Sequence, residues 1–232
     1  NYILKISIIL PILNEVRYIA VVLEAILAPK NINNVLEIII VDGGSTDGTI
    51  DIIKNYISKY PLIRLLHNPY NIVPIGFNMA LNVAKGKYII RIDGHSEIPT
   101  NYIKECINLL ERGVADIVGG NIDTISQGCA GEAIAIAQST WFGVGNVKFR
   151  KVGLSGSGYV ESLAFGVHKR EIFSEIGGYD EEMIRNQDDE FNFRAIQSGK
   201  KIWMDPSIKT KYYSRSNFRQ LFKQYFNYGF YK

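Results

Sequence analysis

The chain has 232 residues, of which 47% are hydrophobic and 21% are charged. This length suits one large domain or two small ones, and the composition is that of a globular protein, so a disordered or fibrous chain is excluded. No apolar run approaches the roughly 18 residues that a membrane-spanning helix needs, and no signal peptide is visible. Cys106 and Cys129 form neither a disulfide framework nor a metal-binding spacing, so we expect a reducing, cytoplasmic environment.

The formal net charge of +3 is unevenly distributed along the chain. Residues 206–232 contain six Lys or Arg, nine aromatic side chains and no acid, so residues 1–205 carry −3. A basic and aromatic C-terminal segment on a mildly acidic body indicates an anionic partner at that end.

Strands and helices alternate over the first 120 residues. Short runs rich in β-branched residues predict buried strands at 5–10, 36–41, 63–67, 88–92 and 116–119. Apolar residues at helical spacing predict helices between them, at 19–27, 50–57, 76–84 and 103–110. This alternation predicts an α/β fold, with a mostly parallel, Rossmann-like sheet flanked by helices.

The second half of the chain is less regular and rich in glycine. We predict a strand at 160–167 and helices at 170–176 and 187–197. No linker interrupts the pattern, so we assign residues 1–210 to one domain. Apolar side chains recur at helical spacing within 218–226, so residues 211–232 are predicted to form a basic amphipathic helix. Such a helix fits the surface of an anionic membrane, although it could also pack on the body of the domain.

Polar residues follow the predicted parallel strands at the edge where such sheets bind ligands. Glu15 follows the first strand, Asp42 the second, and Asp93 and His95 the fourth. A carboxylate and an imidazole separated by Gly94 could coordinate Mn²⁺ or Mg²⁺ and leave room for diphosphate oxygens. An ordinary turn with a solvated histidine is the alternative.

The segment Asp-Gly-Gly-Ser-Thr-Asp-Gly-Thr at 42–49 joins a strand to a helix. Ser45, Thr46 and Asp47 could simply cap that helix. Asp42 directly follows four apolar strand residues, where its carboxylate could accept a hydrogen bond from a nucleobase. The segment is neither a P-loop nor a dinucleotide fingerprint.

Three consecutive acids, at 188–190, open the predicted helix 187–197. The helix dipole favours one or two acids at that position. Three in a row repel one another, which indicates that one of them has a chemical function.

These motifs, together with Pro11, the Gly-Gly-Tyr-Asp-Glu run at 177–181 and Gln187-Asp188, resemble those of family-2 glycosyltransferases of the GT-A fold. The segments 185–192 and 224–229 are similar to succinoglycan-type exopolysaccharide glycosyltransferases. The likeness extends from about residue 6 to residue 232. Two positions depart from the family pattern, since His95 replaces the usual second Asp of the metal motif and Gln187 replaces the usual Glu before the base.

The resemblance implies an inverting, metal-dependent transfer of a hexose, by default from a UDP-sugar, to a glycan or polyprenyl-linked acceptor in surface polysaccharide synthesis. It implies that residues 1–120 bind the nucleotide sugar and residues 121–210 the acceptor. Asp188 would be the catalytic base, and Asp93 and His95 would hold Mn²⁺ or Mg²⁺. The residues expected to bind the nucleotide sugar are Pro11, Glu15, Asp42, Asn78, Asp93 and Arg215.

Two other functions were considered. A sugar-nucleotide pyrophosphorylase would need a glycine-rich loop with Arg and Lys after the first strand, which residues 11–17 lack. A non-catalytic sugar-nucleotide-binding module would be expected to lose the base or the metal motif, whereas Asp188 and Asp93 are both present. We therefore expect an enzyme at the cytoplasmic face of the membrane, in peripheral contact with it through the C-terminal helix and without a nucleic-acid partner.

Overall fold

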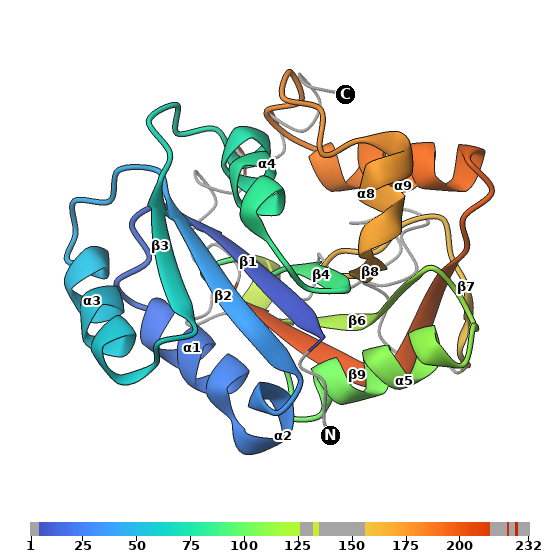
Figure 1. The fold of residues 1–232 in the computed structure, drawn as a ribbon, viewed down its shortest axis with the longest axis horizontal. Coiled ribbons are helices and arrows are strands. Elements are labelled where there is room, and N and C mark those ends of the chain that lie inside the picture. The colour runs from blue at the N-terminus through green and yellow to red at the C-terminus, as the bar shows by residue number, and fades with distance from the viewer. Residues whose placement is uncertain (1–4, 126–131, 135–155, 214–221, 223–225, 227–232) are drawn as a thin grey trace.

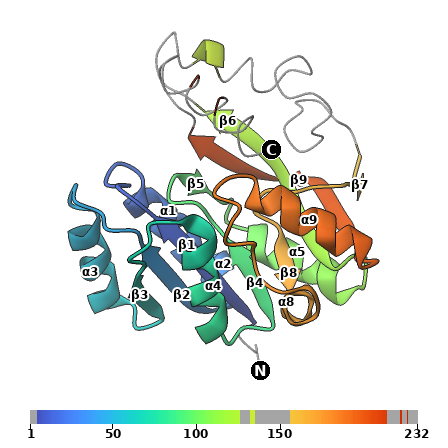
Figure 2. The ribbon, with the colours of Figure 1, turned by 90° about the horizontal axis from the view of Figure 1, so that it is seen from above.

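The computed structural model describes residues 5–125, 132–134, 156–213, 222 and 226. In this part of the chain one mixed sheet carries helices on both faces (Figures 1 and 2). The strand order is β3-β2-β1-β4-β8-β6-β9-β5, and β7 pairs with β9 beside this path. The predicted α/β fold is therefore confirmed.

The first half of the fold forms the parallel part of the sheet. Its strands are β1 (Ile6–Ile12), β2 (Val35–Asp42), β3 (Ile63–His67) and β4 (Tyr88–Arg91). All pairings among these strands are parallel. The helices are α1 (Ile19–Leu27), α2 (Pro29–Ile32), α3 (Thr49–Lys59) and α4 (Val73–Val83). This arrangement confirms the predicted alternation, to which the structure adds the short α2.

The second half is mixed rather than parallel. Its elements are β5 (Ser96–Glu97), α5 (Tyr102–Glu111), β6 (Ile117–Ile125), β7 (Gly158–Tyr159), β8 (Val167–Lys169), α8 (Arg170–Ile176), α9 (Gln187–Gln197) and β9 (Ile202–Tyr213). Strand β8 runs antiparallel to both β4 and β6, whereas β9 runs parallel to β6. The predicted parallel arrangement thus holds for the first four strands and for the β6–β9 pair, whereas β5, β7 and β8 pair with their neighbours in antiparallel fashion.

Two hydrophobic layers cover the two faces of the sheet. Ile8 of β1 and Ile38 of β2 join the layer beneath α1, α3 and α5, which also buries Cys106. The neighbouring residues Ile9 and Ile39 join the opposite layer, beneath α4, α8 and α9. This alternation follows the two-residue period of a strand. Burial on both faces explains why these strands read as continuous apolar runs.

The strand predicted at 160–167 is wrong over most of its length. Only its last residue, Val167, lies in a strand, and Phe165 adopts a left-handed backbone with φ 59°. The backbone of this segment is held by side chains instead, since the Phe165 carbonyl accepts a hydrogen bond from Tyr102 (2.7 Å) and the Leu163 carbonyl accepts one from Asn192 (3.0 Å). The apolar run reflected burial of a loop rather than strand pairing.

The helix predicted for 211–232 is wrong at its start, because Lys211–Tyr213 complete β9 and pair with β5. In this part of β9 the buried Ile208 and Thr210 alternate with exposed lysines, as in a strand with one solvated face. Pro206 and a shift in register against β6 interrupt the ladder, which hides the strand from the sequence pattern. Apart from Phe222 and Phe226, residues 214–232 lie outside the described residues. Among the helices that the structure describes, none has the length and hydrophobicity to cross a bilayer.

Candidate active site

The loops that follow β1 and β2 lie side by side, because Ile12 and Asp42 are paired in register. Four hydrogen bonds join the loops: Asn14 N to Ser45 Oγ (2.9 Å), Thr46 N to Asn14 Oδ1 (2.9 Å), Val16 N to Asp47 Oδ2 (3.1 Å) and Glu15 N to Thr49 Oγ1 (2.9 Å). The polar side chains of the 42–49 segment therefore hold the backbone of the neighbouring loop as well as their own. The two loops form one stiff unit at the carboxyl edge of the sheet.

Asp42 shapes the second of these loops. Its buried carboxylate accepts hydrogen bonds from the backbone N–H groups of Gly44 (3.0 Å) and Ser45 (3.1 Å). Pro11 lies near the end of β1, beside Val41 of β2. Both predicted nucleotide-binding residues thus lie at the expected edge of the sheet.

Glu15 and His95 form a direct pair across this edge. The Glu15 Oε1 and His95 Nδ1 atoms are 2.8 Å apart, and both side chains are mostly buried. Gly94 makes room for the pair, since a Cβ atom there would lie 2.7 Å from Cγ of Glu15. The imidazole also meets the ring of Tyr212 edge-on, with 5.0 Å between centroids. Two side chains predicted for different roles are therefore partners.

Arg91, which the sequence analysis missed, occupies the end of β4 between acidic groups. Its Nη2 atom lies 2.6 Å from Oδ1 of Asp93, and it also hydrogen-bonds the hydroxyl of Tyr179. The side chain is 14% exposed and lies on the same face of β4 as the buried Ile89. A lone arginine on the apolar face of a predicted strand was the signal that could have identified it.

The three acids at the start of α9 have different partners. Asp189 accepts a hydrogen bond from the Ser162 hydroxyl (2.6 Å), and Glu190 pairs with Arg194 (2.8 Å between Oε2 and Nη2). Within the described residues no side chain donates a hydrogen bond to Asp188. Of the three carboxylates, that of Asp188 is the one without a hydrogen bond from a described side chain.

Burial raises the pKa of Asp188 above the ordinary aspartate value, and the charge of Arg91 opposes that rise. The neighbouring carboxylates of Asp189 and Asp93 raise the pKa further. Asp188 and Asp93 therefore belong to one charge cluster around Arg91. A carboxylate with a raised pKa is a stronger base than one in water.

Asn78 lies on α4 and contacts the 178–181 segment instead of the loops after β1 and β2. Its amide exchanges two hydrogen bonds with the backbone of Tyr179 (2.8 and 2.9 Å) and donates another to Glu181 (2.9 Å). The Tyr179 ring stacks on Phe77 at 4.2 Å between centroids. Asn78 therefore fixes the tyrosine that hydrogen-bonds Arg91. Arg215, also predicted to bind the nucleotide sugar, lies outside the described residues.

Asp93 and His95 are the residues predicted to bind a divalent cation. Among the described residues no three His, Cys, Asp or Glu side chains group into a metal site. Asp93 commits Oδ1 to Arg91 and His95 commits Nδ1 to Glu15, which leaves Oδ2 and Nε2 without a hydrogen bond in the described structure. One carboxylate oxygen and one imidazole nitrogen suit Mn²⁺ if a bound diphosphate completes the coordination. The residues present fit a cation shared with the ligand.

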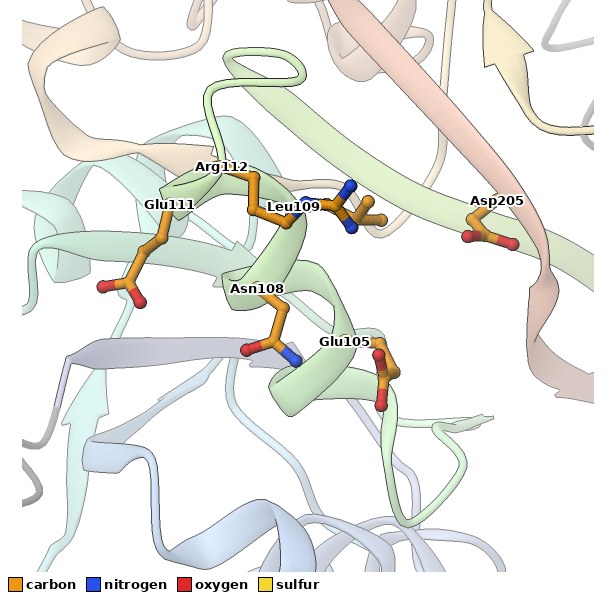
Figure 3. A pocket seen from close by; sticks show the side chains of 6 residues that line it. All are labelled: Glu105, Asn108, Leu109, Glu111, Arg112 and Asp205. Atoms are coloured by element: carbon orange, nitrogen blue, oxygen red, sulfur yellow. The ribbon is translucent and has the colours of Figure 1, made fainter.

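A separate pocket lies between α5 and the start of β9 (Figure 3). Its volume is about 440 Å³, and its lining includes Glu105, Arg112 and Asp205. Glu111, which also lines it, pairs with Lys5 just before β1 begins. The pocket thus extends towards the amino end of β1 and includes none of the predicted site residues.

A Rossmann-like sheet with acidic side chains after β1, β2 and β4, faced by an acid at the start of α9, defines a GT-A glycosyltransferase. The family model for "Glycosyl transferase family 2" matches residues 7–177. This chain belongs to glycosyl transferase family 2, which confirms the resemblance found in the sequence.

Two curated relatives and one solved structure illustrate this membership. The chain is 34% identical to the succinoglycan biosynthesis protein ExoA of Rhizobium meliloti, over 96% of this chain and 67% of that protein. It is 30% identical to a dolichyl N-acetyl-alpha-D-glucosaminyl phosphate 3-beta-D-2,3-diacetamido-2,3-dideoxy-beta-D-glucuronosyltransferase of Methanococcus voltae, over 97% and 71%. The crystal structure of GalNAc-T7 with UDP, GalNAc and Mn²⁺ has the same fold, with a TM-score of 0.73 at 16% identity, over 91% of this chain and 44% of that one.

Proposed function

We propose that this chain is an inverting, metal-dependent glycosyltransferase that moves a hexose from a UDP-sugar to a glycan or polyprenyl-linked acceptor in surface polysaccharide synthesis. The carrying observation is the carboxylate of Asp188, which has a raised pKa and no hydrogen-bond donor among the described side chains, in the same charge cluster as Arg91 and Asp93. The names of the two relatives support the pathway and a lipid-linked acceptor. The UDP and Mn²⁺ bound to GalNAc-T7 support the donor and the metal.

In this mechanism Asp188 accepts the proton of the acceptor hydroxyl as that oxygen attacks the anomeric carbon of the donor. A single displacement on the face opposite the leaving diphosphate inverts the configuration. Asp93 and His95 would hold Mn²⁺ or Mg²⁺, which when bound stabilises the negative charge of the departing diphosphate. Arg91 pairs with Asp93, and its charge opposes the rise in the pKa of Asp188 that burial causes.

The remaining residues have supporting roles in the proposal. Asp42 and Pro11 border the nucleoside at the ends of β2 and β1. Asn78 contributes through Tyr179, whose backbone it holds, and Arg215 reaches the donor diphosphate. Residues 1–120 then bind the donor, and residues 121–210 bind the acceptor.

Donor turnover tests this function. Purified protein is incubated with UDP-glucose, UDP-galactose or UDP-N-acetylglucosamine, with Mn²⁺ or with excess chelator, and released UDP is measured beside the thermal shift that each donor causes. We expect one donor to raise the thermal unfolding midpoint. UDP should be released from this donor in the presence of Mn²⁺ and not in the presence of chelator. Equal UDP release in chelator would contradict the metal dependence, and no response to any of the sugar nucleotides would contradict the proposed donor class.

We also propose that the C-terminal end contacts the cytoplasmic face of the membrane, where a polyprenyl-linked acceptor resides. The support is the composition of residues 206–232, which is basic, aromatic and free of acid. In liposome flotation, binding should rise with the anionic lipid fraction and fall with salt, since surface charges are screened within about 8 Å at physiological ionic strength. Replacing Arg219 and Lys223 together by Gln should weaken flotation. Flotation unchanged by salt or by this double change would contradict electrostatic docking.

A further inference from the structure

We propose that Glu15 is a positioning residue that orients His95 as a cation ligand, and not a nucleoside contact as the sequence suggested. This inference rests on the proposed function, since it concerns the same donor site. Glu15 would then support the metal motif without binding the ion itself. In this motif His95 replaces the aspartate that is usual in the family.

A hydrogen bond joins the side chains of Glu15 and His95. Glu15 Oε1 lies 2.8 Å from His95 Nδ1, which is a good hydrogen-bond distance. When the Nδ1–H group donates this hydrogen bond to the carboxylate, Nε2 is the ring nitrogen that offers a lone pair to a metal ion. A histidine that binds a metal ion almost always gives its other ring nitrogen to a carboxylate, a backbone carbonyl or water in this way. The pair therefore has the arrangement of a metal-binding histidine and its supporting carboxylate.

Glu15 itself is held in place by its backbone hydrogen bonds and by its contact with Gly94. Its backbone N–H donates to Thr49 Oγ1 (2.9 Å), and its carbonyl accepts the N–H groups of Tyr18 and Ile19 (both 2.9 Å), so its backbone is fixed at the start of α1. Its side chain then crosses directly over Gly94, where any Cβ atom would collide with it. The motif Asp-Gly-His therefore needs its central glycine to admit the Glu15 side chain.

His95 is held in place by contacts with the end of β9. The His95 carbonyl accepts a hydrogen bond from the backbone of Tyr213 (3.2 Å), and the ring packs edge-on against Tyr212. With Nδ1 bound to Glu15, the plane of the imidazole and the direction of Nε2 are both set. A carboxylate committed to this task has one oxygen fewer for a nucleobase.

The experiment measures Mn²⁺ affinity by electron paramagnetic resonance and UDP affinity by calorimetry, neither of which requires sugar transfer. Glu15→Ala should weaken Mn²⁺ binding in the presence of UDP by roughly 10- to 100-fold, the usual effect of losing such a supporting partner. Glu15→Gln keeps a hydrogen-bond acceptor and should cause a smaller loss. The control Glu24→Gln changes an exposed carboxylate of α1 that bonds Tyr56, and it should leave both affinities unchanged.

The histidine background separates positioning from nucleoside contact. If Glu15 acts through His95, adding Glu15→Ala to His95→Ala should weaken Mn²⁺ binding no further, and metal-free UDP binding should stay at the wild-type level. If Glu15 contacts the nucleoside, Glu15→Ala should weaken UDP binding equally with and without metal and in both backgrounds. That result, or wild-type Mn²⁺ affinity in Glu15→Ala, would overturn the inference.

Failure of this inference can be distinguished from failure of the proposed function. Suppose that the wild type binds Mn²⁺ in the presence of UDP, that Glu15→Ala weakens this binding, and that the wild type transfers no sugar. This result would contradict the proposed function and support the inference. A protein that transfers sugar while Glu15→Ala keeps full Mn²⁺ affinity would do the reverse. Circular dichroism of each variant ensures that a lost affinity is not lost folding, and Glu15→Gln supplies the second measurement if Glu15→Ala unfolds.

Discussion

Asp188→Asn is expected to lower kcat by about 100-fold or more while the donor Kd stays close to the wild-type value. The asparagine has nearly the same shape but cannot accept the proton of the acceptor hydroxyl. Because the proton moves only during the reaction, loss of the group that accepts it should lower kcat and leave ground-state donor binding unchanged. Steady-state kinetics with the UDP-sugar that the donor screen selects, together with calorimetric donor binding, measure both quantities.

Asp189→Asn is the matched control for this prediction. It removes the adjacent charge of the same helix turn but keeps an oxygen that can accept the hydrogen bond from Ser162. Its kcat should stay within a few-fold of wild type. If Asp188→Asn is fully active and Asp189→Asn is not, the base is Asp189 and the proposed assignment fails.

The parallel half of the fold was predictable because its signals are local. Each of β1, β2 and β4 is a short run rich in β-branched residues, and α3 and α5 carry their apolar residues on one side. The errors occurred where tertiary contacts replace local pattern. Val160, Leu163 and Phe165 are buried in a loop rather than in a strand, and Pro206 lies in β9 where the register against β6 shifts.

The candidate site was predictable only in part, for a related reason. Residues at the ends of parallel strands could be placed at one edge of the sheet from strand order alone, so Glu15, Asp42 and Asp93 were found. The partners of these residues come from distant positions. Glu15 pairs with a histidine 80 residues away, and Asn78 holds the backbone of Tyr179, 101 residues away. A single sequence contains no local signal for such pairs.

Arg91→Met is expected to move the acidic limb of the pH–kcat profile to higher pH by about one unit or more. Arg91 opposes the rise in the pKa of Asp188 that burial causes, so removing its charge should raise that pKa further. A base works when it is deprotonated, and the rate therefore increases as the pH rises through its pKa. As the pH falls, the variant should therefore lose activity before the wild type does, and it should regain part of that activity as the pH rises.

Two controls separate this electrostatic effect from a loss of structure. Arg91→Lys keeps the positive charge, although it loses the forked geometry, and should shift the profile less. Lys169→Met breaks a pair of similar burial, in which Lys169 Nζ lies 2.9 Å from Asp116 Oδ1 at the end of β8. Both methionine variants should lower the thermal unfolding midpoint, but only Arg91→Met should displace the pH profile. Of these two cations, Arg91 is the one whose charge acts on Asp188. If the limb does not move in Arg91→Met, or moves equally in Lys169→Met, then Arg91 does not set the pKa of the base.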